Sequence, residues 1–335
     1  MSDLSAAIQT KFPQKKVVIV GDLVADQFLR GTIARVSREA PVFILRHDET
    51  ETLAGSAANA AVNAATLGGK AVLIGVVGED ANGSALLEKL RESNVDCRLI
   101  VACEKFQTTT KLRVLAGQHY AARQQVIRID YENKNTLAED LRNKLQENFL
   151  AAVTDADVVI ISDYSYGVAS RELTETIMKA AAEKNIPVLV DSRFRLEDFP
   201  NVTSATPNQD EVEQILGKNF SDDDCVKLCE KLNYKSLLVT RGNLGMLLVE
   251  KDKKPLFLEA VGAKEPVDVT GAGDTVIAAF SLALASGLSF AESAKLANHA
   301  GGIVVMKKGT AAVSAEELVD SLKRTQITES KSQTP

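Results

Sequence analysis

From residue 136 onward, short apolar segments alternate regularly with amphipathic ones, and this alternation constrains the fold more than any other feature. We expect helices near residues 137–153, 171–184, 208–216, 222–232, 272–286, 290–305 and 315–323. The strands between them are predicted at Val158–Ser162, Pro187–Val190, Leu237–Thr240 and Met246–Val249. Repeated strand–helix units form a parallel sheet with helices on both faces. The sequence therefore predicts an α/β fold, a doubly wound α/β/α sandwich.

The N-terminal half contains two segments that break this alternation. Val17–Val20 is a β-branched run, typical of a strand buried on both faces. Residues 26–47 and 108–131 instead have the pattern of antiparallel, half-exposed strands, the second pair with a turn at Gly117-Gln118. Because exposed strands need a partner, we expect a small β-sheet that serves as a lid over a binding edge or as a contact between two copies of the chain.

Composition limits the partners that the chain is able to bind. With 45% hydrophobic and 25% charged residues in 335, it has the make-up of a soluble globular protein. The net charge of −6 argues against a nucleic-acid or membrane surface, because both need a basic face. The four cysteines and three histidines show no metal-ligand spacing, and residues 1–16 lack the apolar core of a signal peptide. We therefore expect a cytoplasmic protein whose anionic ligands are held by local lysines and arginines.

The segment Asp268–Ala279 has the features of an anion site at the start of a helix. Gly271 and Gly273 leave room for a phosphate, and a first helical turn offers unpaired N–H groups. A carboxylate beside an anion site needs a chemical task, and Asp274 is a candidate to take the proton from an attacking hydroxyl. A capped helix with an acidic first turn explains the segment equally well.

Neither of the two common glycine motifs for nucleotide phosphates is present. A Walker A loop needs Gly-Lys followed by Ser or Thr, but Ala71 follows Lys70 and Asn219 follows Lys218. A dinucleotide-binding fingerprint needs a third glycine, where this chain has Val276. A hydride-transfer enzyme is therefore disfavoured.

Other polar residues carry weaker signals when taken singly. Asp22 and Asp26 follow the first strand and could accept hydrogen bonds from sugar hydroxyls, although a turn aspartate and a solvated one explain them better. Asn59, on a helix of small residues, offers an amide to such hydroxyls. Asn208 and Glu211 have the spacing of a capping box, which we favour over a water-clad Mg²⁺ site.

Five motifs occur in order along the chain, namely Gly21-Asp22, Ala54–Asn59, Thr206–Glu211, Val239–Gly242 and Asp268–Asp274. Together they resemble the ribokinase (PfkB) family of sugar kinases over about residues 16–320. Within that family the chain is most similar to the heptose-7-phosphate kinases of ADP-heptose synthesis, including the kinase half of the bifunctional enzyme, through residues 35–42, 110–115, 126–130 and 162–164. The resemblance implies one kinase domain over residues 16–323, preceded by an N-terminal extension at 1–15. Residues 324–335 are polar, and we expect them to form a disordered tail.

The resemblance also implies an ATP-dependent reaction in which Asp274 is the base and the anion hole consists of the amides of Gly271, Ala272, Gly273 and Asp274. The sugar would be bound by Asp22, Asp26, Gly55, Asn59 and Asp163. Mg²⁺ and the ATP phosphates would be held by Asn208 and Glu211, largely through water, and by Arg193. The nucleotide would border Thr240, Gly242, Gly245 and Asn298. In some family members a monovalent cation such as K⁺ binds at the positions of Asp268 and Thr270.

Three residues depart from the family pattern. Ser56 replaces the second glycine of Gly-Gly-x-x-Asn, Tyr166 replaces a lysine, and Arg193 replaces a lysine whose phosphate contact it is able to make. A phosphate already on the sugar would be held on the lid by Lys111, Arg113 and Arg128. Strand alternation puts the first two on one face, although a charged outer face explains them equally well.

Two other functions stay open at this point. One is a kinase of another hexose, ketose or nucleoside-like substrate on the same scaffold. The other is a non-catalytic sugar- or nucleotide-binding regulator, against which the intact segment Gly271–Asp274 argues. In each case we expect a small-molecule ligand, no nucleic-acid or membrane partner, and a homodimer formed through the lid strands.

Overall fold

A nine-stranded sheet forms the centre of the computed structural model, which describes residues 3–118, 123–133, 137–263 and 265–332. Its strands, in the spatial order β13-β12-β11-β10-β9-β8-β1-β4-β5, are Leu256–Leu258, Met246–Glu250, Ser236–Thr240, Ser204–Ala205, Val188–Ser192, Val158–Asp163, Lys16–Gly21, Lys70–Gly78 and Ile100–Cys103. Neighbouring strands are parallel, except that β12 is antiparallel to both β11 and β13.

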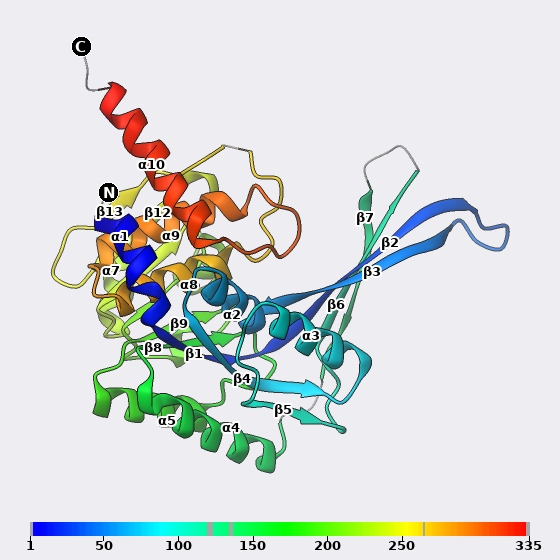
Figure 1. Cartoon of the computed structure of the whole chain (residues 1–335), viewed down its shortest axis with the longest axis horizontal. Coiled ribbons are helices and arrows are strands. Elements are labelled where there is room, and N and C mark those ends of the chain that lie inside the picture. Colours follow the sequence, from blue (N-terminus) through cyan, green and yellow to red (C-terminus); the bar gives the residue numbers. More distant parts are fainter. Residues whose placement is uncertain (1–2, 119–122, 134–136, 264, 333–335) are drawn as a thin grey trace.

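Strand side chains alternate between the two faces of this sheet and fill two hydrophobic cores. In β1, Val17 and Ile19 belong to one core, and Val18 and Val20 to the other. The first core is covered by α1 (Asp3–Thr10), α2 (Ala57–Thr66), α3 (Ala81–Glu92), α8 (Ala272–Ala285), α9 (Phe290–Val304) and α10 (Ala315–Ser332). The second is covered by α4 (Glu139–Ala152), α5 (Arg171–Lys184), α6 (Gln209–Leu216) and α7 (Asp222–Lys231). The predicted doubly wound α/β/α sandwich is confirmed (Figure 1).

The two ends of the chain differ from expectation. The predicted N-terminal extension carries α1, and Ile8 and Phe12 are buried in the first core. Helix α10 continues to Ser332, whereas we predicted a helix end at residue 323 and a disordered tail. Residues 324–332 contain no glycine or proline, so nothing in them interrupts the helical hydrogen bonds.

The two segments that break the alternation form one four-stranded sheet, the outer sheet, which projects from the body in Figure 1. Its strands, in the spatial order β3-β2-β6-β7, are Phe43–Ser56, Leu23–Val36, Thr110–Gly117 and Gln124–Tyr131. The β2–β3 and β6–β7 pairs are antiparallel, as predicted, and the two pairs join through a parallel pairing of β2 with β6. Residues 119–122 of the second segment lie outside the described residues.

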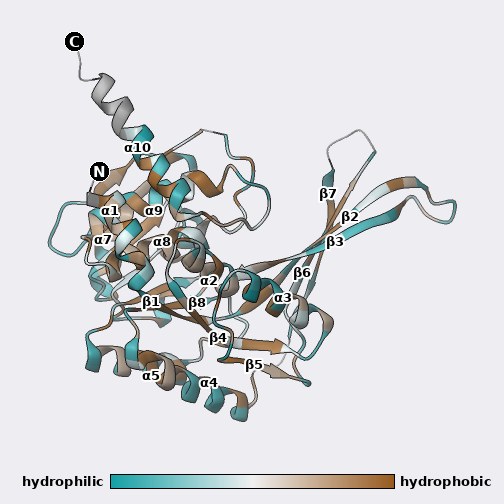
Figure 2. Ribbon diagram, viewed as in Figure 1, coloured by the Kyte–Doolittle hydropathy of each residue, from teal (hydrophilic) through white to brown (hydrophobic). Residues whose placement is uncertain are grey.

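Hydropathy follows this architecture. Figure 2 shows apolar residues concentrated in the central strands and polar residues on the outward surfaces of the helices. Among the residues that the structure describes, no helix combines the length and the apolar character needed to cross a bilayer.

The carboxyl ends of the parallel strands meet at one edge of the central sheet, where open α/β sheets bind ligands. Asp22 follows β1, Asp163 ends β8, and Ser192 ends β9. The start of α8 lies at this edge, since a Cβ on Gly273 would be 3.8 Å from Oδ2 of Asp191. The fold thus brings together the motifs that the sequence distributes over more than 250 residues.

Candidate active site

Helix α8 begins with a tight turn that leaves backbone N–H groups unpaired. Its N-cap, Gly271, has φ of +76°, and a Cβ there would lie 2.4 Å from Nδ2 of Asn59, so only glycine fits. The N–H of Ala272, a predicted anion donor, is bonded to the Val269 carbonyl at 3.2 Å. Those of Gly273 and Asp274 have no partner in the described ranges. Two donors at the positive end of the helix are thus free for an anion.

Asp274 lies in this first turn and is only 2% exposed. The Asn59 side-chain amide donates to Oδ2 at 2.8 Å, and the Tyr164 hydroxyl donates to Oδ1 at 3.3 Å. Burial raises the pKa of Asp274 to about 7, while the two hydrogen bonds act in the opposite direction. A carboxyl group that titrates near neutral pH is well suited to accept a proton during a reaction.

Helix α2 holds Asn59 in the orientation that this contact needs. Nδ2 of Asn63 donates to Oδ1 of Asn59 at 3.1 Å, so that the Asn59 amide nitrogen faces Asp274. Oδ1 of Asn63 in turn accepts a hydrogen bond from the Thr275 hydroxyl at 3.0 Å. Five of the six alanines of α2 are fully buried, namely Ala57, Ala58, Ala60, Ala61 and Ala64, and their small size allows the close approach to α8 on which these contacts depend.

A polar cavity of about 560 Å³ lies between the start of α8 and the outer sheet. The predicted site residues that line it are Asp26, Lys111, Arg113, Arg128, Arg193, Thr270, Gly271 and Asp274. Sequence analysis did not select three further lining residues, Ser56, Tyr164 and Tyr166, as ligands. The cavity is where a sugar would have to lie if Asp274 is to reach its hydroxyl.

The cations of this cavity differ in how they are paired. Arg113 lies 2.5 Å from Asp26, and Arg128 lies 2.8 Å from Asp130. Lys111 has no hydrogen-bond acceptor within the described residues, and its Nζ lies 5.3 Å from the ring centroid of Tyr164. Burial lowers the pKa of Lys111. Of the outer-sheet cations that line this cavity, Lys111 is therefore the most available to a ligand.

Four predicted sugar ligands do not line the cavity, namely Asp22, Gly55, Asn59 and Asp163. Asp22 is 1% exposed, and its oxygens accept hydrogen bonds at 2.9, 3.0 and 3.0 Å from the backbone N–H groups of Tyr164, Tyr166 and Val168. Asp163 is fully buried and accepts hydrogen bonds from Ser192 and Arg195. Since their oxygens are used in this way, both aspartates shape the loop after β8.

Gly55 and Ser56, at the end of β3, form the wall behind Asp26. A Cβ at Gly55 would lie 2.6 Å from Oδ2 of Asp26, so glycine makes room for that carboxylate. Ser56 has φ of +55° and ψ of −132°, a conformation that costs a residue with a side chain roughly 1–3 kcal/mol. The backbone thus keeps the conformation of a glycine where the sequence has a serine.

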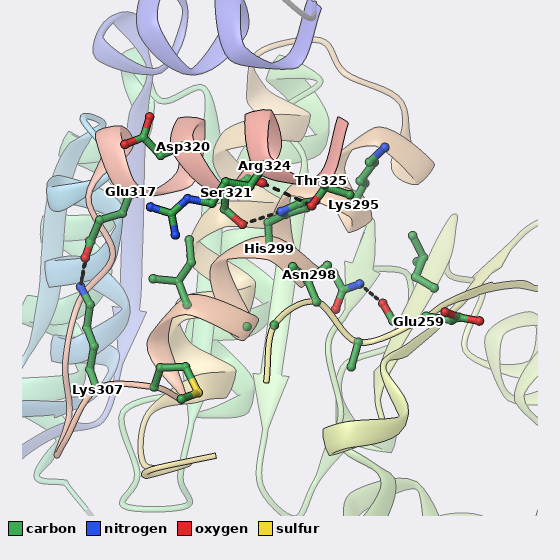
Figure 3. Close-up of a pocket in the computed structure, with 17 residues that line it drawn as sticks. Glu259, Lys295, Asn298, His299, Lys307, Glu317, Asp320, Ser321, Arg324 and Thr325 are labelled. Atoms are coloured by element: carbon green, nitrogen blue, oxygen red, sulfur yellow. Dashed lines mark hydrogen bonds and ion pairs between the residues drawn. The ribbon is translucent and has the colours of Figure 1, made fainter. Parts of the chain in front are cut away.

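A second, apolar cavity of about 160 Å³ adjoins the other side of the α8 turn. Its lining includes the predicted nucleotide residues Thr240, Gly242 and Gly245. A larger hollow of about 1050 Å³, between α9, α10 and the loop after β13, shares Ala260, Val261 and Gly302 with it. Asn298 lies in this larger hollow, where its amide donates to the Glu259 carbonyl at 2.7 Å (Figure 3).

Asn208 and Glu211 form the capping box that the sequence favours. Oδ1 of Asn208 accepts the N–H of Glu211, and Oε2 of Glu211 accepts the N–H of Asn208, both at 2.9 Å. Oε1 of Glu211 takes no part in the box and lies 3.8 Å from Nη1 of Arg193. One carboxylate oxygen of Glu211 is therefore still able to face a cation or a bound water.

Asp191 is a candidate residue that sequence analysis missed. It is 8% exposed and has no hydrogen-bond donor among the described residues. Burial and the nearby charge of Glu211 raise the pKa of Asp191 well above its usual range. An unpaired, buried carboxylate beside a second carboxylate fits a divalent cation. Over the described ranges, however, no group of three or more His, Cys, Asp or Glu side chains could hold a metal ion.

Asp268 and Thr270, the predicted monovalent-cation positions, lie just before the α8 turn and are bonded to each other. Oδ1 of Asp268 accepts both the N–H of Thr270, at 3.0 Å, and its hydroxyl, at 2.7 Å. Oδ2 accepts the N–H of Gly309 at 2.9 Å. These bonds tie the turn to the loop before α10.

A comparison with family models decides what kind of site this is. Residues 14–317 match the model of the pfkB family carbohydrate kinases. The chain belongs to this family. A PfkB kinase is an ATP-dependent phosphotransferase that acts on a sugar hydroxyl with the help of a divalent metal ion. The helix start, the buried carboxylate and the two cavities described above fit that chemistry.

Curated relatives support the same assignment and extend over nearly the whole chain. The chain is 40% identical over 324 residues to the bifunctional protein HldE of Haemophilus influenzae (strain PittEE), covering 95% of this chain and 65% of that protein. It is 39% identical over 309 residues to the bifunctional protein HldE of Gluconobacter oxydans (strain 621H), covering 90% of this chain and 63% of that protein. The PfkB chain thus spans just under two thirds of these relatives.

Solved structures of the same fold share less sequence. An Arabidopsis thaliana ribokinase complexed with ribose and ATP aligns with a TM-score of 0.71 and 23% identity, covering 92% of this chain and 98% of that one. Phosphofructokinase-2 from Escherichia coli in complex with potassium aligns with a TM-score of 0.74 and 21% identity, covering 93% of this chain and 99% of that one. These likenesses establish the ribokinase-like fold.

Proposed function

We propose that this PfkB kinase transfers the γ-phosphoryl group of ATP to a hydroxyl of heptose 7-phosphate, on the route to ADP-heptose and lipopolysaccharide precursors. The observation that carries the proposal is Asp274, a buried carboxyl group that lines the same polar cavity as Lys111. Over the described ranges, the N–H groups of Gly273 and Asp274 beside it have no partner, and Lys111 has no acceptor. The 40% identity with the bifunctional protein HldE over 95% of the chain supports this sugar in particular.

In the proposed reaction Asp274 takes the proton of the attacking hydroxyl. The sugar oxygen then bonds to the γ-phosphorus while the bond from that phosphorus to the bridging oxygen of ADP breaks. The N–H groups of Gly273 and Asp274 stabilise the charge on the transferring group. Asp26 and Asn59 are close enough to the base to orient the sugar hydroxyls, since Asp26 lines the cavity and Asn59 contacts Asp274.

The nucleotide base would lie at the apolar cavity beside Thr240 and Gly245, because binding sites for flat organic rings are usually lined by apolar groups. Mg²⁺ would neutralise charge on the ATP phosphates. Asp191 and Glu211 would hold it, partly through water, and Arg193 would contact a phosphate. We also propose K⁺ near Asp268 and Thr270, by analogy with the potassium complex of the E. coli phosphofructokinase-2.

The sugar phosphate would be bound on the outer sheet. Among the residues that the structure describes, Lys111 is half-buried without a hydrogen-bond acceptor, and Arg128 forms its ion pair with the partly exposed Asp130. Arg113 is already engaged with Asp26, so it would contribute charge to the site while keeping that ion pair. This assignment makes the phosphate the feature that distinguishes the substrate from a neutral sugar.

An assay of ADP release tests the proposal. Heptose 7-phosphate, unphosphorylated heptose, fructose 6-phosphate, ribose and adenosine are compared at matched concentrations, and heptose 7-phosphate should give the highest kcat/KM. Lys111→Met should lower kcat/KM for the phosphorylated heptose by about 10- to 100-fold, because a charge-assisted hydrogen bond is lost. Lys251→Met, an exposed lysine after β12, is the matched control.

The other outcomes of this assay separate the alternatives. A higher kcat/KM with a different sugar or nucleoside would assign the chain to another substrate of the PfkB family. Binding of sugar or nucleotide without ADP release from any substrate would identify a non-catalytic regulator. Because the proposed reaction consumes ATP and a sugar phosphate, we infer that the enzyme acts in the cytoplasm.

We further infer a homodimer that forms through the outer sheet. Strands β3 and β7 are its two edges, and they expose the apolar side chains of Phe43, Val126, Ile127, Ile129 and Tyr131. Exposed apolar edge strands are usually covered by a partner. Light scattering after size exclusion should give a dimer, and Ile127→Lys should produce a monomer. A monomeric parent protein would contradict this inference.

A further inference from the structure

We propose that Tyr164 is a positioning residue of the active site, whose hydroxyl holds Asp274 and whose ring supports Lys111 of the outer sheet. The inference rests on the proposed function, because it requires Asp274 to act as the base. It adds a physical link between the residue that binds the substrate's charge and the residue that takes its proton.

The first half of the link is the contact with the base. The Tyr164 hydroxyl donates to Oδ1 of Asp274, while Asn59 donates to Oδ2. With one donor on each oxygen, the carboxyl plane of Asp274 is fixed from two sides. A base whose plane is fixed keeps its lone pairs directed at the attacking hydroxyl, which is the orientation that general base catalysis requires.

The position of Tyr164 is itself determined by the loop after β8. Its N–H donates to Oδ2 of Asp22 at 2.9 Å, and two more N–H groups of the same loop donate to that carboxylate. The next residue, Ser165, has φ of +63° and donates its N–H to Asp163 at 3.2 Å. Asp22 and Asp163, which do not line the cavity, thus hold the loop that places Tyr164 in the cavity.

The second half of the link is the contact with the outer sheet. Nζ of Lys111 lies 5.3 Å from the ring centroid of Tyr164 and 5.9 Å from that of Tyr166. A cation within about 6 Å of the centroid of an aromatic ring is attracted by the negative charge of the ring face. The aromatic rings therefore hold Lys111 at the cavity without neutralising its charge, and the charge stays available to an anionic substrate.

Tyr164 keeps its proton throughout, which lets it serve as a constant donor. Burial, and next the neighbouring Asp274, raise the pKa of Tyr164 well above its ordinary value. Two other charged groups that act on Asp274 come from the outer sheet: Asp26 favours the protonated form of Asp274, and Lys111 favours its ionised form. Asp191 on β9 is also close enough for its charge to interact with that of Asp274. Among the groups that favour ionisation, Tyr164 and Asn59 do so by direct hydrogen bonds.

Tyr164→Phe separates the two halves, because it removes the hydroxyl and keeps the ring. We expect kcat to fall by about 10-fold, as for the loss of one hydrogen bond to a charged group. The acid limb of the pH–rate profile should move up by about half a unit to one unit, since the lost bond favoured the ionised form. KM for the phosphorylated sugar should stay within about twofold of the parent value because Lys111 keeps its aromatic neighbour. Tyr131→Phe, which removes an exposed hydroxyl on β7 outside the cavity lining, should leave the acid limb in place.

Tyr164→Leu removes the ring as well and should raise KM in addition to lowering kcat. An independent readout needs no substrate: the ¹³C carboxyl resonance of Asp274, identified by its absence in Asp274→Asn, should titrate at higher pH in Tyr164→Phe than in the parent. An unchanged titration, or an unchanged kcat and acid limb, would overturn the inference. If the parent protein itself releases no ADP with any sugar, the proposed function fails, and the NMR titration still decides whether Tyr164 acts on Asp274.

Discussion

Arg113 of strand β6 lies 2.5 Å from Oδ1 of Asp26 on the neighbouring strand β2, and the two side chains are only 12% and 6% exposed. The pair joins the two halves of the outer sheet at the floor of the polar cavity. Breaking a buried ion pair leaves one charge without compensation, which is far more destabilising than losing an exposed pair. The ion pair is thus both a part of the sugar site and a structural contact.

Replacing Arg113 by methionine should therefore lower the free energy of unfolding by about 3 kcal/mol. The matched control is Arg30→Met, because Arg30 forms exposed pairs with Glu49 and Glu51 on the same sheet and should lose less than about 1 kcal/mol. Urea denaturation measures both changes. Equal losses in the two variants would show that burial of the Arg113 pair has no energetic consequence.

Asp274→Asn should lower kcat by at least about 100-fold, because the side chain loses its ability to accept a proton. The amide keeps the shape of the carboxylate, so ATP should still bind, as measured by isothermal titration calorimetry. The control is Asp252→Asn, in the exposed turn after β12, which should leave kcat unchanged. Near-normal turnover of Asp274→Asn would reject its assignment as the base.

The reaction rate should depend on pH in the direction that Asp274 dictates. Its pKa is raised to about 7, and a general base works in its deprotonated form. The value of kcat/KM should therefore rise as the pH increases through about 7 and level off above it. A rate that is constant from about pH 5.5 upward would place the essential base elsewhere, since an aspartate with an ordinary pKa is already ionised there.

Ser56→Gly should stabilise the protein by about 1 kcal/mol, because glycine adopts the positive φ at this position without strain. The hydroxyl of Ser56 makes no capping hydrogen bond to α2, so its loss should cost little. Ser56→Ala keeps the strain and should not stabilise the protein. Thermal unfolding of the parent protein and the two variants distinguishes these cases. Equal melting temperatures of the parent and Ser56→Gly would show that the backbone at Ser56 is not strained.

Glu211→Gln should separate the two roles of this side chain. Glutamine can replace glutamate in a capping box, so stability should change by less than about 1 kcal/mol, whereas the Mg²⁺ concentration for half-maximal activity should rise about 10-fold as a charge is lost. Glu292→Gln, in the capping box of Ser289 at the start of α9, is the matched control. An unchanged Mg²⁺ requirement in Glu211→Gln would leave Glu211 with a structural role alone.

Local signals in the sequence predict much of this fold. Helix α5 begins after Ser170, whose side chain caps it, and ends at Asn185 in the left-handed conformation, and both signals are typical of helix ends. The α8 turn is predicted for the same reason, since the conformation of Gly271 and the position of Asp274 depend on adjacent residues.

Features that depend on distant parts of the chain could not be predicted. The parallel pairing of Ala25–Thr32 with Thr110–Gly117 joins segments about 85 residues apart, and no periodicity encodes it. Asp22 and Asp26 are indistinguishable as sequence positions. Only the fold shows that Asp22 accepts hydrogen bonds from the loop after β8, whereas Asp26 lines the cavity. Asp191 was missed because its role depends on burial beside Gly273.

Strands β2 and β3 each run for 14 residues, from the pairing of Leu23 with Ser56 in the body to that of Val36 with Phe43 at the tip of the outer sheet, with two shifts of register between these ends. The same ribbon that reaches into solvent therefore carries Asp26 at its base. The pairing of the two strands continues on both sides of these shifts, so a second subunit that binds the tip would also change the position of Asp26 in the sugar site. Affinity for substrate and self-association should then vary together, even though the two contacts lie at opposite ends of one hairpin.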